Sequence, residues 1–226
     1  MTPVLVSVIV PVLNGARFLG ECLGSLIAQD HPALDIVVVD AGSTDGSAQL
    51  AEGFSGVRVL RRANEGLSAS RNAGLGAAAG PLIGFCDSDD VWKPDKARRQ
   101  VEYLEAHPDV GVVLCRQDTM FEPGAAWPDW LRPDQVRGDL DGVSPTSGLF
   151  RRAVFDRLGG FRGMDQLGTE FDLELLIRAR AAGLPIALLE DALCVRRIHG
   201  DNLTSRSEPF LAPMFKVVRD HLRSRT

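Results

Sequence analysis

The sequence predicts an α/β protein in which one mostly parallel central sheet is flanked by helices. Through residue 115, apolar runs alternate with segments of helical periodicity, an order typical of parallel strands joined by crossover helices. The runs are continuous rather than alternating, as expected of strands buried on both faces. The chain has 226 residues, of which 45% are hydrophobic and 24% are charged, so its composition is that of one ordinary globular domain.

The strand candidates in this first part are short runs rich in valine, isoleucine and leucine. They lie at residues 4–10, 35–40, 57–60, 82–86 and 110–115. Pro11 should end the first strand, and Asn14 with Gly15 should form the turn that follows it.

Four helix candidates separate these strands. The first, at residues 16–29, carries apolar side chains at helical spacing. Ser43 or Thr44 can cap the second, which should run to about residue 53. The third spans residues 67–79, and Pro94 can begin the fourth, which should reach His107.

After residue 115 the pattern becomes less regular. Residues 121–145 hold four prolines together with Trp127 and Trp130, so we expect an irregular segment over the sheet, which at this length is usually functional. The two tryptophans could stack on the ring of a bound ligand or pin the segment, and both interpretations stay open. The elements expected beyond it are a strand at 146–150, helices at 152–158, 170–182 and 210–222, a turn at 159–161, and strand pieces at 185–189 and 193–197.

The apolar run at residues 82–86 stops abruptly in three carboxylates, Asp87, Asp89 and Asp90. Adjacent carboxylates repel and resist burial, so they should lie at the carboxyl end of the strand. Ligands bind at that edge in open α/β sheets, and a divalent cation would supply the missing counter-charge. The alternative is a cluster that caps the helix near Pro94.

Several classes of function are disfavoured by composition and motifs. The net charge of −5 argues against nucleic acid as a partner. Neither a GxGxxG turn nor a GxxxxGK[ST] loop is present. The four cysteines form no CxxC pair and are expected to be buried free thiols in a reducing compartment. No basic leader is evident, and the longest apolar run, residues 4–13, is far below the roughly 20 residues that span a bilayer. A cytoplasmic location is therefore expected.

Seven short motifs follow one another at family-like intervals. They are Pro11–Asn14, Val39–Asp45, Asn64–Gly66 with Arg71–Asn72, Asp87–Asp90, Gly159–Phe161, Glu170, and His199–Asn202. Each motif is weak by itself, but the set in register resembles a family 2 glycosyltransferase with the A-type (GT-A) fold. The resemblance covers residues 4 to about 205. It implies a single Rossmann-like domain in which residues 1–115 bind the nucleotide sugar and residues 116–226 bind the acceptor and carry the catalytic base.

The resemblance also implies a reaction. A sugar would pass from a nucleotide-sugar donor, expected to be a UDP-sugar, to a hydroxyl of a saccharide, lipid-linked or protein acceptor, with inversion at the anomeric carbon. Glu170 falls on the position of the general base. A divalent metal, Mn²⁺ or Mg²⁺, would be held by Asp89, with His199 beside it.

The nucleotide-binding positions are carried over in the same way. They are Pro11, Asn14, Asp40, Arg71, Asp87 and Ser88. Asp40 would accept a hydrogen bond from the base, Pro11 and Asn14 would shape the nucleoside pocket, and Asp87 would contact the ribose. Arg71 would lie along the pocket, the alternative being a surface residue of its helix.

Three positions depart from the family pattern. Ala41 stands where a second acid is common, Thr169 precedes Glu170 where Glu-Asp is usual, and Leu13 replaces an aromatic residue. These departures keep open an alternative: a catalytically silent nucleotide-binding relative that acts as a partner subunit in polysaccharide assembly. A nucleotidyltransferase is disfavoured because residues 12–18 lack a glycine-rich basic loop.

Some partners and side chains stay open at this stage. Arg196 and Arg197 could hold phosphate or be solvated. A basic C-terminal segment could bring the chain to the inner face of a membrane, although four charges are thin support; they are Lys216, Arg219, Arg223 and Arg225. A homodimer is also open.

Overall fold

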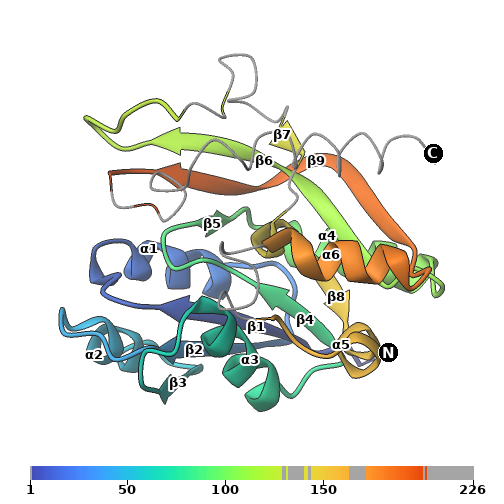
Figure 1. Cartoon of the computed structure of the whole chain (residues 1–226), viewed down its shortest axis with the longest axis horizontal. Helices are drawn as coiled ribbons and strands as arrows, with labels where there is room; N and C mark the ends of the chain where they lie inside the picture. Colours follow the sequence, from blue (N-terminus) through green and yellow to red (C-terminus); the bar gives the residue numbers. More distant parts are fainter. Residues whose placement is uncertain are drawn as a thin grey trace.

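The computed structural model describes residues 2–128, 131, 140–141, 144–162, 172–200 and 202. Within this part of the chain, nine strands form one sheet, and helices cover both of its faces (Figure 1). The expected α/β architecture is confirmed. None of the described helices has the length and apolar character that crossing a membrane requires.

The sheet is mixed and mostly parallel, as predicted. Its order runs β3 (Val57–Arg61), β2 (Leu34–Asp40), β1 (Val6–Val12), β4 (Leu82–Phe85), β8 (Leu149–Arg151), β6 (Val112–Phe121), β9 (Ile186–Ile198) and β5 (Val91–Trp92), with β7 (Leu140–Asp141) paired to β6. The strands β3, β2, β1 and β4 are parallel, and β6 is parallel to β9. The antiparallel pairs are made by β8 with β4 and β6, by β5 with β9, and by β7 with β6.

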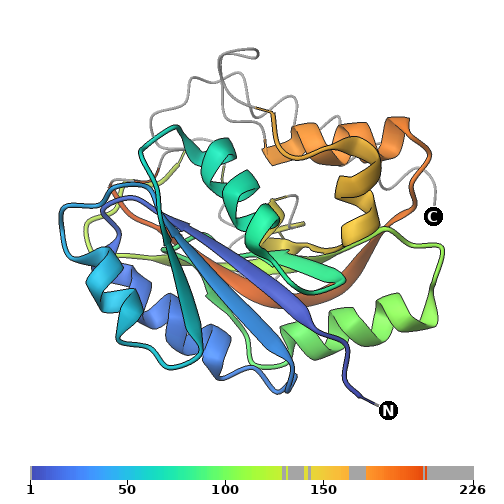
Figure 2. The same ribbon diagram turned by 90° about the horizontal axis from the view of Figure 1, so that it is seen from below.

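The helices divide between the two faces of the sheet (Figure 2). On one face lie α1 (Ala16–Ile27), α2 (Ser47–Glu52) and α4 (Lys96–Ala106). The other face carries α3 (Leu67–Ala77), α5 (Arg152–Leu158) and α6 (Asp172–Ala181). A short 3-10 turn, Pro145–Ser147, precedes β8.

The hydrophobic core is correspondingly split into two clusters by the sheet. Along β2, Ile36 and Val38 belong to the cluster under α1 and α4, whereas Val37 and Val39 belong to the cluster under α3, α5 and α6. Successive side chains of a strand point to opposite faces, so a strand covered on both sides must be apolar throughout. All four cysteines are buried free thiols in the first cluster, which confirms this part of the prediction made for them from the sequence.

The expectation that Pro11 ends the first strand is wrong, because β1 continues through Pro11 to Val12. The Ile9 carbonyl accepts a hydrogen bond from Cys86 on the β4 side, whereas the Val6 N–H donates to Ala33 on the β2 side. By the period of two, the nitrogen of Pro11 also faces the β4 side. The last residue of β4 in this pairing lies opposite Ile9, so the missing N–H of Pro11 breaks no strand pairing.

The second half contains the larger differences from prediction. The strands expected at 185–189 and 193–197 are one strand, β9, and β6 runs to Phe121 instead of ending near residue 115. The two pair in parallel from Val112–Ile186 to Phe121–Ile198, with irregular register around Arg116. Polar side chains along residues 116–119 had hidden the strand signal.

Smaller corrections concern helix ends. The N-cap of α2 is Gly46, at φ +90°, and not Ser43 or Thr44. Helix α4 begins at Lys96, two residues after Pro94. The expected strand at 146–150 is the 3-10 turn followed by β8. The helix expected at residues 210–222 lies outside the described residues.

Candidate active site

The candidate site lies where the parallel strands β1, β2 and β4 end at the same edge of the sheet. Strand β4 stops at Phe85, and the Asp90 N–H donates to the Asp87 carbonyl at 3.0 Å, which closes a turn through the acidic residues. The predicted position of these acids at a strand's carboxyl end is confirmed. They do not cap α4, because β5 lies between Asp90 and that helix.

The loops after β1 and β2 are joined by Asn14 and Ser43. The Asn14 N–H donates to Ser43 Oγ at 2.9 Å, and Asn14 Oδ1 accepts the Thr44 N–H at 2.8 Å. Asn14 has φ +52°, a left-handed conformation that asparagine tolerates. Asp40 is 3% exposed at the end of β2, and its carboxylate accepts the Ser43 N–H at 3.2 Å. Asp40, Asn14 and Pro11 therefore share this end of the sheet, and their nucleotide role stays a prediction.

Helix α1 starts beside the acidic turn and is capped from the neighbouring loop. Asp45 Oδ2 accepts the Ala16 N–H at 2.9 Å, and Ser47 Oγ accepts the Gly15 N–H at 3.0 Å. A Cβ at Gly15 would meet Ser88 Oγ at 3.0 Å, so the absence of a side chain lets the helix start approach the acidic turn. Burial raises the pKa of Asp45, but hydrogen bonds, first from Ser47, leave that pKa below its ordinary value.

Arg71 is buried and bonded to the acidic turn. Its Nη2 donates to Asp87 Oδ1 at 3.0 Å, and its guanidinium lies 5.4 Å from the Phe161 ring centroid. The alternative of a solvated helix residue is wrong, because the Arg71 side chain is 3% exposed. Thr146 accepts the Asp87 N–H at 3.2 Å and holds the turn from the side of β8. Arg71 thus orients Asp87.

The next residue, Asn72, clamps the turn at residues 159–161. Asn72 Oδ1 accepts the Phe161 N–H and Asn72 Nδ2 donates to the Phe161 carbonyl, both at 2.8 Å. A Cβ at Gly160 would lie 2.2 Å from Asn72 Oδ1, so only glycine fits there. The Arg71–Asn72 motif and the Gly159–Phe161 motif, which are far apart in the sequence, are therefore in direct contact in the fold.

Asp89 and His199 meet at the centre of the site. His199 Nε2 lies 3.0 Å from Asp89 Oδ2, and Asn202 Nδ2 donates to the same oxygen at 3.1 Å. Asn202 Oδ1 also accepts the His199 N–H at 2.6 Å. Burial, followed by the negative charge of Asp87, raises the pKa of Asp89. The predicted neighbours are therefore brought together, with Asn202 as a bridge between them.

The chemistry of this pair fits a divalent cation. A carboxylate oxygen and an imidazole nitrogen converge here, and such ligands suit Mn²⁺, while Mg²⁺ prefers a few carboxylates with water and phosphate oxygens. Among the described residues, no three His, Cys, Asp or Glu side chains gather as a complete metal site. A cation held by Asp89 and His199 would therefore need further oxygen ligands.

Arg197 is a site residue that sequence reasoning left undecided. Only 5% of its side chain is exposed, so the solvated interpretation is wrong. Its Nε donates to the Asp89 carbonyl at 3.0 Å, and its main-chain N–H donates to Asp90 Oδ1 at 3.0 Å. The pKa of Asp90 is raised well above its ordinary value by burial and by the charges of Asp89 and Asp87. The sequence shows an acidic residue in the turn and an arginine in the last strand, but no local pattern pairs the two. Sequence reasoning therefore could not find this contact.

Two other predicted residues have different outcomes. Ser88 lies in the turn against Gly15, and its nucleotide role stays a prediction. Glu170, the expected base, and Thr169 lie outside the described residues. Trp127 is described: its ring stacks on Phe121 with centroids 4.7 Å apart, and its Nε1 donates to the Leu131 carbonyl. These contacts hold Trp127 against Phe121 and Leu131, but its ring is 48% exposed, so both interpretations stay open; Trp130 is not described.

The sequence model of Glycosyl transferase family 2 matches residues 7–159 of this chain. The chain belongs to this glycosyltransferase family. An uncharacterized glycosyltransferase of Nostoc sp. is 35% identical over 169 residues, which are 68% of this chain and 52% of that protein. The putative teichuronic acid biosynthesis glycosyltransferase TuaG of Bacillus subtilis is 34% identical over 105 residues, 44% of this chain and 42% of its own. This chain thus spans about half the length of these relatives.

Two solved structures share the fold. TarS of S. aureus in complex with UDP-GlcNAc matches with a TM-score of 0.74 at 24% identity, over 90% of this chain and 61% of that one. The mannosyltransferase PcManGT of Pyrobaculum calidifontis, in complex with GDP-Man and Mn²⁺, matches with a TM-score of 0.73 at 24% identity, over 97% of this chain and 66% of that one. At this identity the likeness establishes the GT-A fold alone.

Proposed function

We propose that this family 2 glycosyltransferase chain transfers a sugar from a UDP-sugar to an acceptor hydroxyl in a metal-assisted, inverting single displacement. The observation that carries the proposal is the meeting of Asp89, His199 and Asn202 at the sheet edge where Asp40 and Asn14 also lie. Structural neighbours that bind UDP-GlcNAc and GDP-Man with Mn²⁺ support the donor class and the metal.

The nucleoside would bind at the loops after β1 and β2. A buried carboxylate is costly unless donors face it, and Asp40 accepts one main-chain N–H from Ser43. The ring N–H of a uracil is a second suitable donor. Guanine also offers N–H donors, so Asp40 by itself does not choose between the two bases, and the UDP preference rests on the family resemblance. Asp87, fixed by Arg71, would receive the ribose hydroxyls.

The diphosphate would bind beside Asp89 and His199, which would hold Mn²⁺ or Mg²⁺ there. Such a cation supplies Lewis-acid stabilisation of the charge that develops on the leaving nucleoside diphosphate. The protein must orient the Asp89 carboxylate and the His199 ring toward the same cation position. Asn202 does this by contacting Asp89 and the main chain of His199 together.

The acceptor hydroxyl is a poor nucleophile and needs a base within hydrogen-bond reach. We propose Glu170 for this role on its position in the motif order. One carboxylate base with no protein nucleophile performs a single displacement, and attack from the face opposite the leaving group inverts the anomeric carbon. The same residues would serve a saccharide, lipid-linked or protein acceptor.

Isothermal titration of UDP, and separately GDP, with and without Mn²⁺ tests the donor site, followed by an assay of donor hydrolysis. We expect UDP to bind more tightly with Mn²⁺ and UDP-sugar to be slowly hydrolysed. If GDP binds more tightly than UDP, the proposed donor would be a GDP-sugar instead of a UDP-sugar. Metal-dependent binding without any turnover would favour a silent nucleotide-binding subunit, and no binding of either nucleotide would refute the proposed site.

A further inference from the structure

The buried, positively charged side chain of Arg197 contacts the main chain of Asp89, one of the two proposed metal ligands. The guanidinium of Arg197, at the end of β9, donates through Nε to the main-chain carbonyl of Asp89 at 3.0 Å. A positive charge at this distance repels a divalent cation, so electrostatics alone would disfavour an arginine here. Its presence therefore calls for another explanation, which its remaining contacts supply.

The main chain of Arg197 holds both parts of the site. Its N–H donates to Asp90 Oδ1 at 3.0 Å, and its carbonyl accepts Asn202 Nδ2 at 3.2 Å. The same Asn202 nitrogen contacts Asp89 Oδ2. The acidic turn and the His199 loop are thus fastened to one residue, from its backbone and its side chain together.

The outer end of the guanidinium is fixed by acids from other elements. Nη1 donates to Glu122 at the end of β6, and Nη2 donates to Glu21 of α1. Glu122 also pairs with Arg17 at 2.9 Å, and the Phe18 ring lies 4.7 Å from both the Arg197 guanidinium carbon and the His199 ring centroid. Two glutamates offset the charge of Arg197, so a rigid anchor is gained with little local excess of positive charge.

We propose that Arg197 is a positioning residue for cation binding: it ties α1, β6 and β9 to the Asp89 carbonyl and so fixes the direction of the Asp89 carboxylate and the His199 ring. This inference rests on the proposed function. Residues that orient metal ligands from behind typically contribute about 10- to 100-fold to metal affinity. Lysine keeps the charge but lacks the planar set of donors that reaches three partners at once.

The variants Arg197→Lys and Arg197→Met separate geometry from charge. If Arg197 acts only through its charge, Met should tighten Mn²⁺ binding and Lys should leave it unchanged. If it positions the ligands, both variants should weaken Mn²⁺ binding in the presence of saturating UDP, Lys by about 10-fold and Met by at least as much. Mn²⁺ binding is measured by the loss of the free-ion electron paramagnetic resonance signal on titration.

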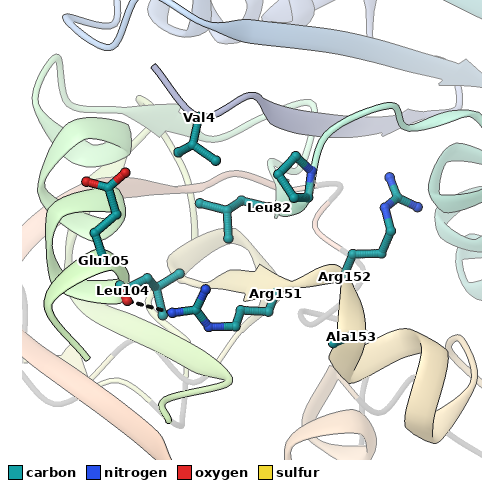
Figure 3. A pocket seen from close by; sticks show the side chains of 8 residues that line it. Val4, Leu82, Leu104, Glu105, Arg151, Arg152 and Ala153 are labelled. Atoms are coloured by element: carbon teal, nitrogen blue, oxygen red, sulfur yellow. Dashed lines mark hydrogen bonds between the residues drawn. The ribbon is translucent and has the colours of Figure 1, made fainter. Parts of the chain in front are cut away.

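Arg151 of β8 offers a matched control, because it lies opposite Leu82 at the start of β4, whereas the acidic turn follows the end of that strand. Figure 3 shows the Arg151 guanidinium bonded to Leu104. Its guanidinium also bonds main-chain carbonyls, those of Val110 and Leu104, beside a hollow of about 310 Å³. Arg151→Met should lower the thermal unfolding midpoint, as Arg197→Met should, but leave Mn²⁺ affinity unchanged. The two variants therefore distinguish lost stability from lost positioning.

The outcomes are distinct. Weaker Mn²⁺ binding in Arg197→Lys, with normal binding in Arg151→Met, supports the inference. Wild-type affinity in Arg197→Lys, or tighter binding in Arg197→Met, overturns it and leaves the proposed function standing. Absence of Mn²⁺ binding by the wild-type chain with UDP refutes the proposed function, and the inference with it. Should the Met variant fail to fold, the Lys variant decides.

Discussion

The clamp between Asn72 and the turn at Gly160 leads to a quantitative prediction. In Gly160→Ala, the new Cβ would lie 2.2 Å from Asn72 Oδ1, and the other two nearest atoms also belong to Asn72. Asn72 must therefore move and lose its two hydrogen bonds with Phe161, each 2.8 Å long. At about 0.5–1.5 kcal/mol per bond, the free energy of unfolding should fall by about 1–3 kcal/mol.

A double-mutant cycle makes this reasoning sharper. Asn72→Ala should also cost about 1–3 kcal/mol, since it removes the same two bonds. The double variant should cost no more than Asn72→Ala alone, because the collision disappears with the Asn72 side chain. Urea unfolding followed by tryptophan fluorescence measures all three variants.

Gly76 provides the control for the substitution itself. It lies inside α3, and a Cβ there would meet nothing within 4 Å. Gly76→Ala should therefore raise the free energy of unfolding by about 0.5–1 kcal/mol through helix propensity. A loss below about 0.5 kcal/mol in Gly160→Ala, or full additivity with Asn72→Ala, would refute the clamp.

Three further predictions concern the site and its supports. Asp89→Ala should abolish metal-dependent UDP binding in calorimetry, and wild-type binding would remove Asp89 from the metal site. Glu170→Gln should keep UDP affinity but slow transfer by roughly 100-fold or more, and an unchanged rate would exclude Glu170 as the base. Burial raises the pKa of Asp35, but hydrogen bonds from Ser7 and Ala79 and the Arg58 charge leave it below 3.8. Asp35 therefore stabilises the fold above that pH, and the stability difference between wild type and Asp35→Asn in urea unfolding should shrink as pH falls below 3.8. A constant difference would contradict this linkage.

Much of the first half of the fold could be predicted because its signals are local. A strand covered by helices on both sides must be largely apolar, as β1, β2 and β4 are, and a run of carboxylates such as Asp87–Asp90 must end the strand. The same logic placed the acids at the sheet edge, and the motif order then brought Asp89 and His199 into one hypothesis.

The extent of β6 and β9 was harder to predict, because their pairing joins segments that lie about 75 residues apart, from Val112–Ile186 to Phe121–Ile198, and polar side chains interrupt both runs. The prediction that Pro11 ends the first strand was wrong for a related reason. A proline ends a strand only where its nitrogen should pair, and this depends on how far the neighbouring strand extends.

The sequence by itself determined which residue types stand at strand ends, since burial and charge repulsion act on neighbours along the chain. Only the tertiary structure decided which of these residues touch. The cap of α1 comes from Asp45, the clamp on Phe161 from Asn72, and the support of Asp89 from Arg197, each across a distance in sequence that no local pattern encodes. Such hydrogen bonds form because folding brings separate strand ends to one edge, where each buried polar group requires a partner.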